Sequence, residues 1–263
     1  VVGATPVVAD IDSDGDPDVI CGSFDGKIYA LEGGDGKVLW KVDTGEAIYA
    51  RASVSDLDGN GIPEIVVGSR DFHLYRLEGT TGEVLSRFET RGVLDGQVEI
   101  LDLNGDSRPE VVVASGDGVL YALLLEEGQW KPLWTHPLGA VSSGGVCVLA
   151  KESGALVVAC KNGQVVAVDR AGKRLWTVQL EGRCYGAPRA WEGKIWVGST
   201  AGWVYQIDAS GRILNRWNAR GAVLGPVGLG EGKFAVGTRE GQLSLFDLEG
   251  RKKWRGFQLG SSI

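Results

Sequence analysis

The sequence predicts an all-β fold built from one four-stranded antiparallel unit that repeats along the chain. Three observations support this: an acidic motif that recurs at a fixed interval, a hairpin motif that continues beyond it, and a high glycine content. Glycine accounts for 41 of the 263 residues, about double the usual share of roughly 7%. In a chain of short β-branched runs this indicates many tight turns, because glycine adopts left-handed conformations without steric cost.

The acidic motif occurs three times in the first half of the chain. Its copies read DIDSDGDPDVICGS, DLDGNGIPEIVVGS and DLNGDSRPEVVVAS. They begin at Asp10, Asp56 and Asp102, so both intervals are 46 residues. A fixed period of this length is typical of proteins that stack one supersecondary unit many times.

The hairpin motif follows each acidic motif and continues after the acidic motif has disappeared. It occurs six times, which gives about 44 residues per unit. Each copy ends at an aromatic residue, namely Trp40, Phe88, Trp134, Trp176, Trp217 and Trp254. We expect units at about 1–48, 49–94, 95–141, 142–184, 185–223 and 224–263.

Within one unit the apolar runs are short and alternating, with Gly, Asp or Asn between them, which indicates antiparallel strands joined by hairpins. In the first unit the strands are expected near 5–9, 18–22, 27–31 and 37–42. Four strands per unit at this period predict the blade of a β-propeller. Helices are not expected, because no window of about a dozen residues keeps a helical apolar spacing without a glycine.

The two ends of the chain carry similar linker-like segments, GSSI at 260–263 and VVGATP at 1–6. We therefore expect a single domain, 1–263, with six blades and with the cut in the ring between two blades. A seven-bladed ring that uses a segment absent from this chain is the alternative.

Charge and hydropathy exclude two classes of partner. The chain has 27 Lys and Arg against 34 Asp and Glu, a net charge of −7, whereas a nucleic-acid surface needs concentrated Lys and Arg. No run of about 18 apolar residues occurs, so no membrane insertion is expected. We expect a monomer.

The acidic motifs have the spacing of calcium-binding loops. Side-chain oxygens fall at alternate positions around a tight bend, and Ca²⁺ takes six to eight oxygen ligands. Up to three structural Ca²⁺ sites are predicted. The first uses Asp10, Asp12, Asp14, Asp18 and the carbonyl of Asp16; the second uses Asp56, Asp58, Asn60, Glu64 and the carbonyl of Ile62; the third uses Asp102, Asn104, Asp106 and Glu110.

The alternative interpretation is that Asp, Asn and Gly only form hydrogen-bonded turns. The third loop is the weakest match, because Ser107 stands where the other two loops have glycine. An EF-hand is excluded, because it needs Glu at position 12, where Cys21, Val67 and Val113 stand, and because strands flank the loops.

These motifs resemble two known repeats. The D-x-D-x-D-G-x-x-D loop resembles the FG-GAP repeat of integrin-α-type propellers and covers the first three units. The Y-A-L-E-x-x-x-G-K-V-L-W element resembles the repeat of PQQ-like, quinoprotein-type propellers and covers all six. The resemblance implies a β-propeller in which Ca²⁺ braces the hairpin between the first two strands of a blade. It also implies that Trp40, Trp134, Trp176, Trp217 and Trp254 dock between blades, with Phe88 as a conservative departure.

No catalytic motif is visible. The only histidines, His73 and His136, stand near no recognisable nucleophile motif. The four cysteines show no C-x-x-C spacing, and a vicinal pair like that of quinoprotein dehydrogenases is missing. Buried thiols are expected, with a disulfide left open, at Cys21, Cys147, Cys160 and Cys184. We therefore expect a non-enzymatic protein.

The expected role is a calcium-braced scaffold that recognises an unknown protein or small ligand at one mouth of the propeller. The alternative is a cofactor- or carbohydrate-binding or enzymatic propeller with a ligand in the central funnel. Candidate contact residues are Arg51, Gln97, Arg183 and Arg189, in linkers entering innermost strands, and Trp203 on a hairpin. Calcium sites of extracellular modules are often weak and are useful only where calcium is plentiful. An extracellular, periplasmic or cell-surface location is therefore expected.

Overall fold

The computed structural model describes residues 2, 4–149, 154–225, 227–230, 232–249 and 251–258. The regular structure of these residues consists of strands, in six four-stranded sheets. In each sheet four consecutive strands are hydrogen-bonded in chain order and run antiparallel. The described residues contain no helix long and apolar enough to cross a membrane.

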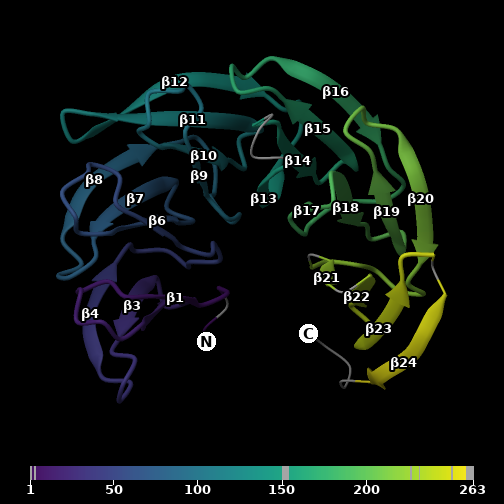
Figure 1. Cartoon of the computed structure of the whole chain (residues 1–263), viewed down its shortest axis with the longest axis horizontal. Coiled ribbons are helices and arrows are strands. Elements are labelled where there is room, and N and C mark those ends of the chain that lie inside the picture. Colours follow the sequence, from purple (N-terminus) through teal and green to yellow (C-terminus); the bar gives the residue numbers. More distant parts are fainter. Residues whose placement is uncertain are drawn as a thin grey trace. The chain divides into compact units, whose positions relative to one another are not determined.

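The chain folds into two compact units, Val1–Pro137 and Leu138–Ile263. The first holds three sheets, whose strands carry the purple to teal colours in Figure 1. These strands are β1 (Val7–Ala9), β2 (Asp18–Gly22), β3 (Lys27–Leu31) and β4 (Val38–Asp43); β5 (Ser53–Ser55), β6 (Glu64–Gly68), β7 (His73–Glu78) and β8 (Val84–Glu89); and β9 (Glu99–Leu101), β10 (Glu110–Ala114), β11 (Val119–Glu126) and β12 (Gln129–Pro137).

The second unit holds the other three sheets, coloured from green to yellow in Figure 1. They comprise β13 (Ser142–Val148), β14 (Leu156–Cys160), β15 (Gln164–Val168) and β16 (Arg174–Gln179); β17 (Arg189–Trp191), β18 (Lys194–Gly198), β19 (Trp203–Ile207) and β20 (Ile213–Asn218); and β21 (Gly228–Gly230), β22 (Lys233–Gly237), β23 (Gln242–Asp247) and β24 (Lys252–Gln258).

Within each unit, consecutive sheets pack against one another through apolar side chains. In the first unit one cluster joins Ile20 and Ile28 to Ile65 and Tyr75 of the following sheet. The second strand of a sheet is therefore covered on both faces, and every residue of β6, β10 and β14 is buried. This explains their uninterrupted apolar runs, whereas the edge strand β4 alternates with exposed residues.

The predicted aromatic docking is confirmed for two tryptophans. Trp40 Nε1 donates a hydrogen bond to the carbonyl of Gly79 in the next sheet, at 2.6 Å. Trp176 Nε1 donates in the same way to Ala209, at 2.8 Å. Each indole lies against a glycine of the turn, because a Cβ atom at Gly82 or Gly211 would lie 2.6 or 2.7 Å from the ring. The indole thus requires glycine at this point of the neighbouring hairpin.

Two further aromatic positions also pack onto the following sheet. Trp217 stacks on Trp196 with ring centroids 5.1 Å apart and contacts Phe234. Phe88, which replaces tryptophan, meets the ring of Tyr121 edge-on at 5.5 Å. The docking of Trp134 stays a prediction, and the side chain of Trp254 lies outside the described residues.

The strand predictions for the first unit are confirmed to within two residues, and all six sheets fall inside the predicted unit boundaries. The single domain, the six-bladed ring and its seven-bladed alternative stay predictions. Residues 1, 3 and 259–263, on which the predicted junction of the ring rests, lie outside the described part of the chain.

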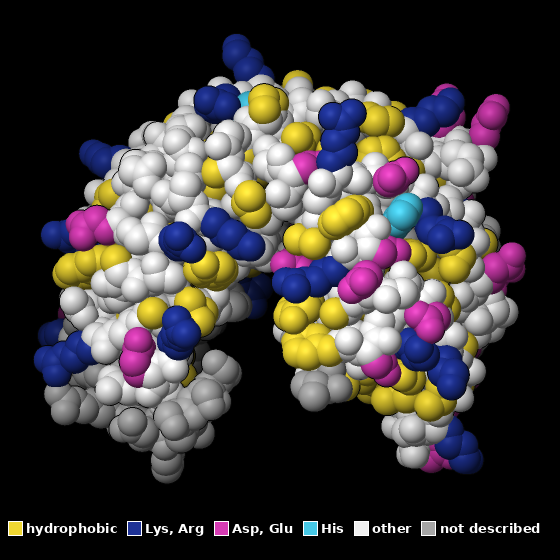
Figure 2. All heavy atoms as spheres, turned by 180° about the vertical axis from the view of Figure 1, so that it is seen from behind, with side chains coloured by type: hydrophobic (Ala, Val, Ile, Leu, Met, Phe, Trp, Pro, Cys, Tyr) yellow, Lys and Arg dark blue, Asp and Glu magenta, His cyan; other side chains and the backbone are white. Residues whose placement is uncertain are grey.

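Charged side chains of both signs lie intermingled on the surface. On the face drawn in Figure 2, Lys and Arg side chains are interspersed with Asp and Glu side chains, and apolar patches lie between them. No broad basic area is visible on that face.

Candidate functional site

The first acidic loop, loop 1 (residues 10–18), connects β1 to β2 and is shaped by its own carboxylates. Asp10 accepts hydrogen bonds from the backbone amides of Ser13 at 2.7 Å and Gly15 at 3.2 Å. The buried carboxylate of Asp18 accepts from the amides of Ile11 and Gly33, both at 3.2 Å. The loop is therefore folded around inward-facing acidic groups.

Loop 1 gathers five carboxylates into two overlapping groups. Oxygen atoms of Asp10, Asp12 and Asp18 lie within 4.8 Å of one another, and so do those of Asp12, Asp14 and Glu32. Glu32 directly follows β3 and was not predicted from the sequence. The signal was present as the glutamate of YALE, one residue after the strand. Among the described residues, no salt bridge reaches these five groups.

Electrostatics show a surplus of negative charge at loop 1. The pKa of Asp12 is raised by desolvation and by repulsion from Asp14, Asp18 and Asp10. The pKa of Glu32 is raised by desolvation and by repulsion from Asp14 and Asp18. An oxygen-only donor set with these properties fits a hard divalent cation such as Ca²⁺. The predicted carbonyl ligand belongs to Asp16, whose amide donates to Asp14 at 2.8 Å.

Loop 2 (residues 56–64) repeats this backbone arrangement between β5 and β6. Asp56 accepts from the amides of Gly59 at 2.8 Å and Gly61 at 2.9 Å. The buried Glu64 accepts from the amide of Leu57 at 2.6 Å. Oxygen atoms of Asp56, Asp58 and Glu64 lie within 4.8 Å of one another. Asn60 Oδ1 accepts from the amide of Ile62 at 2.7 Å, so both remaining predicted residues help to shape the turn.

Loop 2 differs from loop 1 because a buried arginine reaches its carboxylates. Nη2 of Arg76, on β7, contacts Oδ2 of Asp58 and Oε1 of Glu64. The Arg76 side chain is 3% exposed. Burial raises the pKa of Glu64, and Arg76 opposes that shift. A positive charge of the chain itself therefore already occupies the position where the sequence predicts a metal ion.

Sequence reasoning missed Arg76, although the signal was visible. The same register position holds Ala30 in the first sheet and Ala122 in the third, opposite Ile20 and Val112 respectively. The YALE motif thus becomes YRLE in the second unit alone. A basic residue inside a buried strand indicates a buried acidic partner, because unpaired buried charges are costly.

In loop 3 (residues 102–110) a side-chain amide, that of Asn104, contacts the carboxylates. Asp102 accepts from the amides of Gly105 at 2.6 Å and Ser107 at 3.0 Å. Asn104 Nδ2 donates to Asp106 at 3.1 Å and to Glu110 at 2.9 Å. Loops 2 and 3 and the β11–β12 hairpin line a cavity of about 610 Å³.

The predicted contact residues of the first unit come together at its short first strands. Arg51 Nη1 lies 3.4 Å from Gln97 Oε1, and Gln97 Nε2 donates to Glu99 at 3.2 Å. Both residues line a cavity of about 320 Å³ with residues of β1, β5 and β9. Arg51 Nε is buried without a hydrogen-bond partner.

The predicted contact residues of the second unit are less alike. Arg183 and Arg189 are exposed. Arg183 Nη1 donates to the hydroxyl of Tyr185 at 3.4 Å and lowers the pKa of that tyrosine. Trp203 is only partly buried and packs on the apolar cluster of its unit, and the Arg216 guanidinium lies 4.5 Å from its ring centroid. Trp203 is therefore held by Arg216 of its own sheet and by the apolar cluster that this sheet shares with the preceding one.

The histidines and cysteines are all partly or fully buried. His73 Nδ1 lies 3.0 Å from the carbonyl oxygen of Asp71, and His136 is buried. All four cysteines are buried thiols. Burial raises the pKa of Cys160 to about 11 and that of Cys184 to about 12. These thiols are therefore protonated at neutral pH and are poor nucleophiles.

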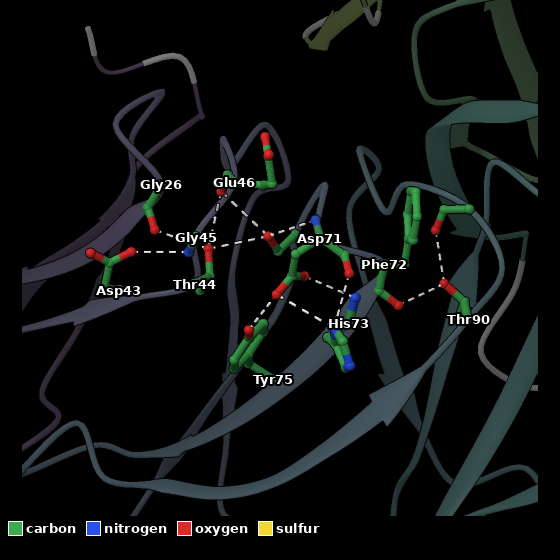
Figure 3. A network of polar contacts seen from close by, with 12 residues as sticks. Gly26, Asp43, Thr44, Gly45, Glu46, Asp71, Phe72, His73, Tyr75 and Thr90 are labelled. Atoms are coloured by element: carbon green, nitrogen blue, oxygen red, sulfur yellow. Dashed lines mark hydrogen bonds and ion pairs between the residues drawn. The ribbon is translucent and has the colours of Figure 1, made fainter.

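A polar network ties the hairpin turns of the first unit together (Figure 3). The Thr44 hydroxyl donates to the carbonyl of Gly26 at 2.9 Å and lies 3.1 Å from the Ser69 hydroxyl of the next sheet. The Tyr75 hydroxyl donates to Asp71, and the pairs Tyr29–Asp25 and Tyr121–Asp117 repeat this bond at 2.7 and 2.8 Å. Repeated polar groups thus fix the turns.

Solved structures show that the architecture is that of known propellers. BamB from Moraxella catarrhalis is 17% identical, with a TM-score of 0.70, and the match covers 98% of this chain and 80% of that one. The computationally designed Ika8 protein is 18% identical over 94% of this chain and 73% of its own, also at 0.70. BBS1N, solved in complex with ARL6DN, is 13% identical over 99% and 85%, at 0.75.

At these identities the likeness shows the fold alone, a β-propeller. No curated protein matches the chain. The comparisons lend no support to the FG-GAP resemblance. The PQQ-like resemblance is confirmed: the family described as outer membrane protein assembly factor BamB matches residues 9–176, 117–214 and 161–262, and the chain therefore belongs to this family.

Proposed function

We propose that the chain is a non-catalytic β-propeller scaffold that binds a protein partner outside the cytosol and is braced by calcium at loop 1. The family supports the first part, because its description names an assembly factor of the outer membrane. It also supports a periplasmic or cell-surface location. The six sheets are proposed to be consecutive blades of one propeller, in line with their face-to-face packing within each unit.

The scaffold proposal rests on one observation: polar side chains form hydrogen bonds that shape the loops and turns. In the described residues, the buried Asp18, Glu64 and Glu110 each accept a backbone amide of their own loop. The Asp–Tyr pairs and the threonine hydroxyls close turns. Catalysis needs a nucleophile or an acid–base pair whose groups converge on a substrate. Here the ionisable groups stabilise the scaffold.

Calcium is proposed for loop 1 because, in the described residues, neither a cationic side chain nor a side-chain amide reaches the carboxylates that cluster there. In loop 2 the guanidinium of Arg76 supplies the positive charge, and in loop 3 the amide of Asn104 bridges two carboxylates. A bound ion would be held by Asp10, Asp12 and Asp18 or by Asp12, Asp14 and Glu32, and the second group would join the β1–β2 loop to the end of β3. Its role would be structural.

The scaffold proposal can be tested by site-specific photo-crosslinking. A photoreactive phenylalanine analogue is placed at exposed positions of each hairpin in the chain, which is then secreted into the periplasm of a Gram-negative host. The expected result is a small set of protein adducts of constant mass from neighbouring positions. Adducts spread evenly over the surface, or none, would contradict a specific scaffold.

A second candidate function is binding of a small ligand or cofactor in a funnel. The cavity of about 320 Å³ beside Arg51 favours it, because Arg51 Nε is buried there without a partner. The purified protein is examined for a visible chromophore and then dialysed against pyrroloquinoline quinone with Ca²⁺. Retained absorbance in the wild type that is lost in Arg51→Ala would favour the cofactor function over the scaffold.

A further inference from the structure

Six hairpin turns of the chain share one left-handed backbone position, and the turn of the second sheet has a different residue there from the other five. Five turns place glycine at the same position, with φ between 76° and 84°. The second hairpin places Phe72 there, with φ of 74°. Left-handed backbone is unfavourable for any residue with a Cβ atom and rare for a bulky one. The five glycines are Gly26, Gly118, Gly163, Gly202 and Gly241.

The hydrogen bonds of this turn do not involve the phenylalanine ring. The carbonyl of Phe72 accepts bonds from the amide and hydroxyl of Thr90 at 2.8 and 2.9 Å. The carbonyl of Gly26 accepts the same two bonds from Thr44, at 2.8 and 2.9 Å. Glycine therefore serves equally well. The Phe72 ring points away from the hydrogen-bonded network in Figure 3, and the residue is 45% exposed.

Phe72 belongs to a surface that carries other exposed aromatic residues. Phe24 and Tyr49 are 41% and 38% exposed and stack with centroids 4.4 Å apart. The Arg70 guanidinium lies 4.0 Å from the Tyr49 centroid and is held by two bonds to Asp95, at 2.8 and 3.0 Å. We name Phe24, Tyr49, Arg70 and Phe72 the aromatic turn face.

Backbone contacts place these side chains on neighbouring turns. The amide of Arg70 donates to the carbonyl of Ala47 at 3.3 Å, which joins the second hairpin to the linker that carries Tyr49. The amide of Ile48 donates to Ser23, next to Phe24, at 3.0 Å. Aromatic residues and arginine are enriched at protein interfaces, and tyrosine and arginine are among the residues that dominate binding energy there.

The turns around this face are acidic. Segments 23–27, 43–49, 69–73 and 89–95 contain six Asp and Glu residues against three Lys and Arg residues. Two of the three cations are already paired, Lys27 with Asp43 and Arg70 with Asp95. The carboxylates of Glu46 and of Asp25, which accepts the Tyr29 hydroxyl, are exposed on these turns. Charge complementarity therefore favours a cationic partner.

We propose that the aromatic turn face docks an extended protein segment in which apolar side chains are flanked by Lys or Arg, with Phe72 as its main anchor. This inference rests on the proposed scaffold function and specifies its surface and its partner chemistry. The strain at Phe72 is kept because binding uses the ring, as expected where an unfavourable backbone conformation lies at a functional site.

The proposal predicts opposite effects of one substitution on stability and on binding. Phe72→Gly restores the residue that the other five turns use. Its melting temperature should rise by about 2–4 °C. Its affinity for the segment should fall at least tenfold. A phenylalanine with a structural role would instead lower the melting temperature when removed. Gly118→Phe, the matched reverse change in the third hairpin, should lower the melting temperature and leave binding unchanged.

The binding probe is a random dodecapeptide library displayed on phage and selected on the wild-type chain, with Phe72→Gly as the counter-target. We expect enriched peptides that combine aliphatic or aromatic residues with Lys or Arg and lose binding to Phe72→Gly. Enriched peptides that bind both proteins equally, or that are acidic, would overturn this surface but leave a scaffold function standing. If no peptide is enriched, both this inference and its scaffold basis lose support.

Discussion

Loops 1 and 2 share a backbone hydrogen-bond pattern and differ in charge balance. Each begins with an aspartate that accepts two amides of the loop, at Asp10 and Asp56, and each ends with a buried carboxylate. Loop 1 then adds a fifth carboxylate, Glu32. Loop 2 instead receives the guanidinium of Arg76. The comparison teaches that one turn can fold with a buried guanidinium of the chain beside its carboxylates or with a further carboxylate there instead.

The difference between the two loops comes from one register position of the strand that follows β2 or β6. Arg76 and Ala30 occupy equivalent places on β7 and β3, opposite Val66 and Ile20. On the other side, Arg76 faces the small Ser86, whereas Ala30 faces the large Trp40. The first sheet therefore uses this space for the indole that docks on the next sheet, and the second sheet uses it for a buried cation.

The largest effect is expected from Arg76→Ala, which would remove the positive charge beside the loop 2 carboxylates. Without the guanidinium, Asp58 and the buried Glu64 lose their counter-charge. Removal of one partner of a buried ion pair costs about 3–5 kcal/mol. Urea unfolding in EGTA should show this loss, and 1 mM Ca²⁺ should restore part of it.

Arg87→Ala is the control for Arg76→Ala, because Arg87 lies on the neighbouring strand β8 but is exposed. It should change stability by less than about 0.5 kcal/mol. If Arg76→Ala is as stable as the control in EGTA, the ion pair in loop 2 does not have the role assigned to it.

The next effect concerns calcium at loop 1. Asp12 belongs to both carboxylate groups, and Asp12→Asn keeps an oxygen that can accept the amide of Asp14. Wild type should gain about 2.7 kcal/mol when free Ca²⁺ is 100 times the Kd. The variant should lose most of this gain, as measured by thermal unfolding in EGTA and in calcium.

The matched variant is Asp58→Asn in loop 2, where Arg76 already supplies the charge. It should leave the calcium response of the wild type intact. A response that disappears in Asp58→Asn and persists in Asp12→Asn would reverse the comparison and place the ion in loop 2.

A smaller effect should follow from Asn104→Asp in loop 3. The change replaces the amide that donates to Asp106 and Glu110 with a further carboxylate. In EGTA the protein should lose roughly 0.5–1.5 kcal/mol. It should also gain a second calcium-binding step in isothermal titration calorimetry. Unchanged stability together with one binding step would show that loop 3 does not depend on its amide.

The repeated elements could be predicted from the sequence, and the exceptions could not. Strand positions in the first unit follow from alternation and turn residues, and Trp40 docks as expected. Glu32 and Arg76 escaped prediction because they lie outside the loop motif, after β3 and on β7, and meet the loops only when the sheet forms. The left-handed backbone of Phe72 could not be predicted, since a sequence motif does not reveal a backbone angle.

The smallest expected effect is a pH dependence that isolates Glu32. Its pKa is raised above the ordinary value of 4.5, first by desolvation and then by repulsion from Asp14 and Asp18. A carboxyl group with a higher pKa in the folded state binds more protons there than in the unfolded state. Its contribution to stability therefore falls as the pH rises through this window. Relative to Glu32→Gln, metal-free wild type should lose melting temperature as the pH rises above 4.5 and then level off.

At neutral pH, calcium should make the wild type more stable than Glu32→Gln. The Glu32 carboxylate is a ligand for the ion, whereas the glutamine side chain would be only a weak one. Glu78→Gln, at the equivalent position beside loop 2, should show no such difference from the wild type because Arg76 compensates loop 2 at every pH in this range. If both variants respond to calcium and pH in the same way, the fifth carboxylate does not distinguish loop 1 from loop 2, and the difference rests on Arg76 alone.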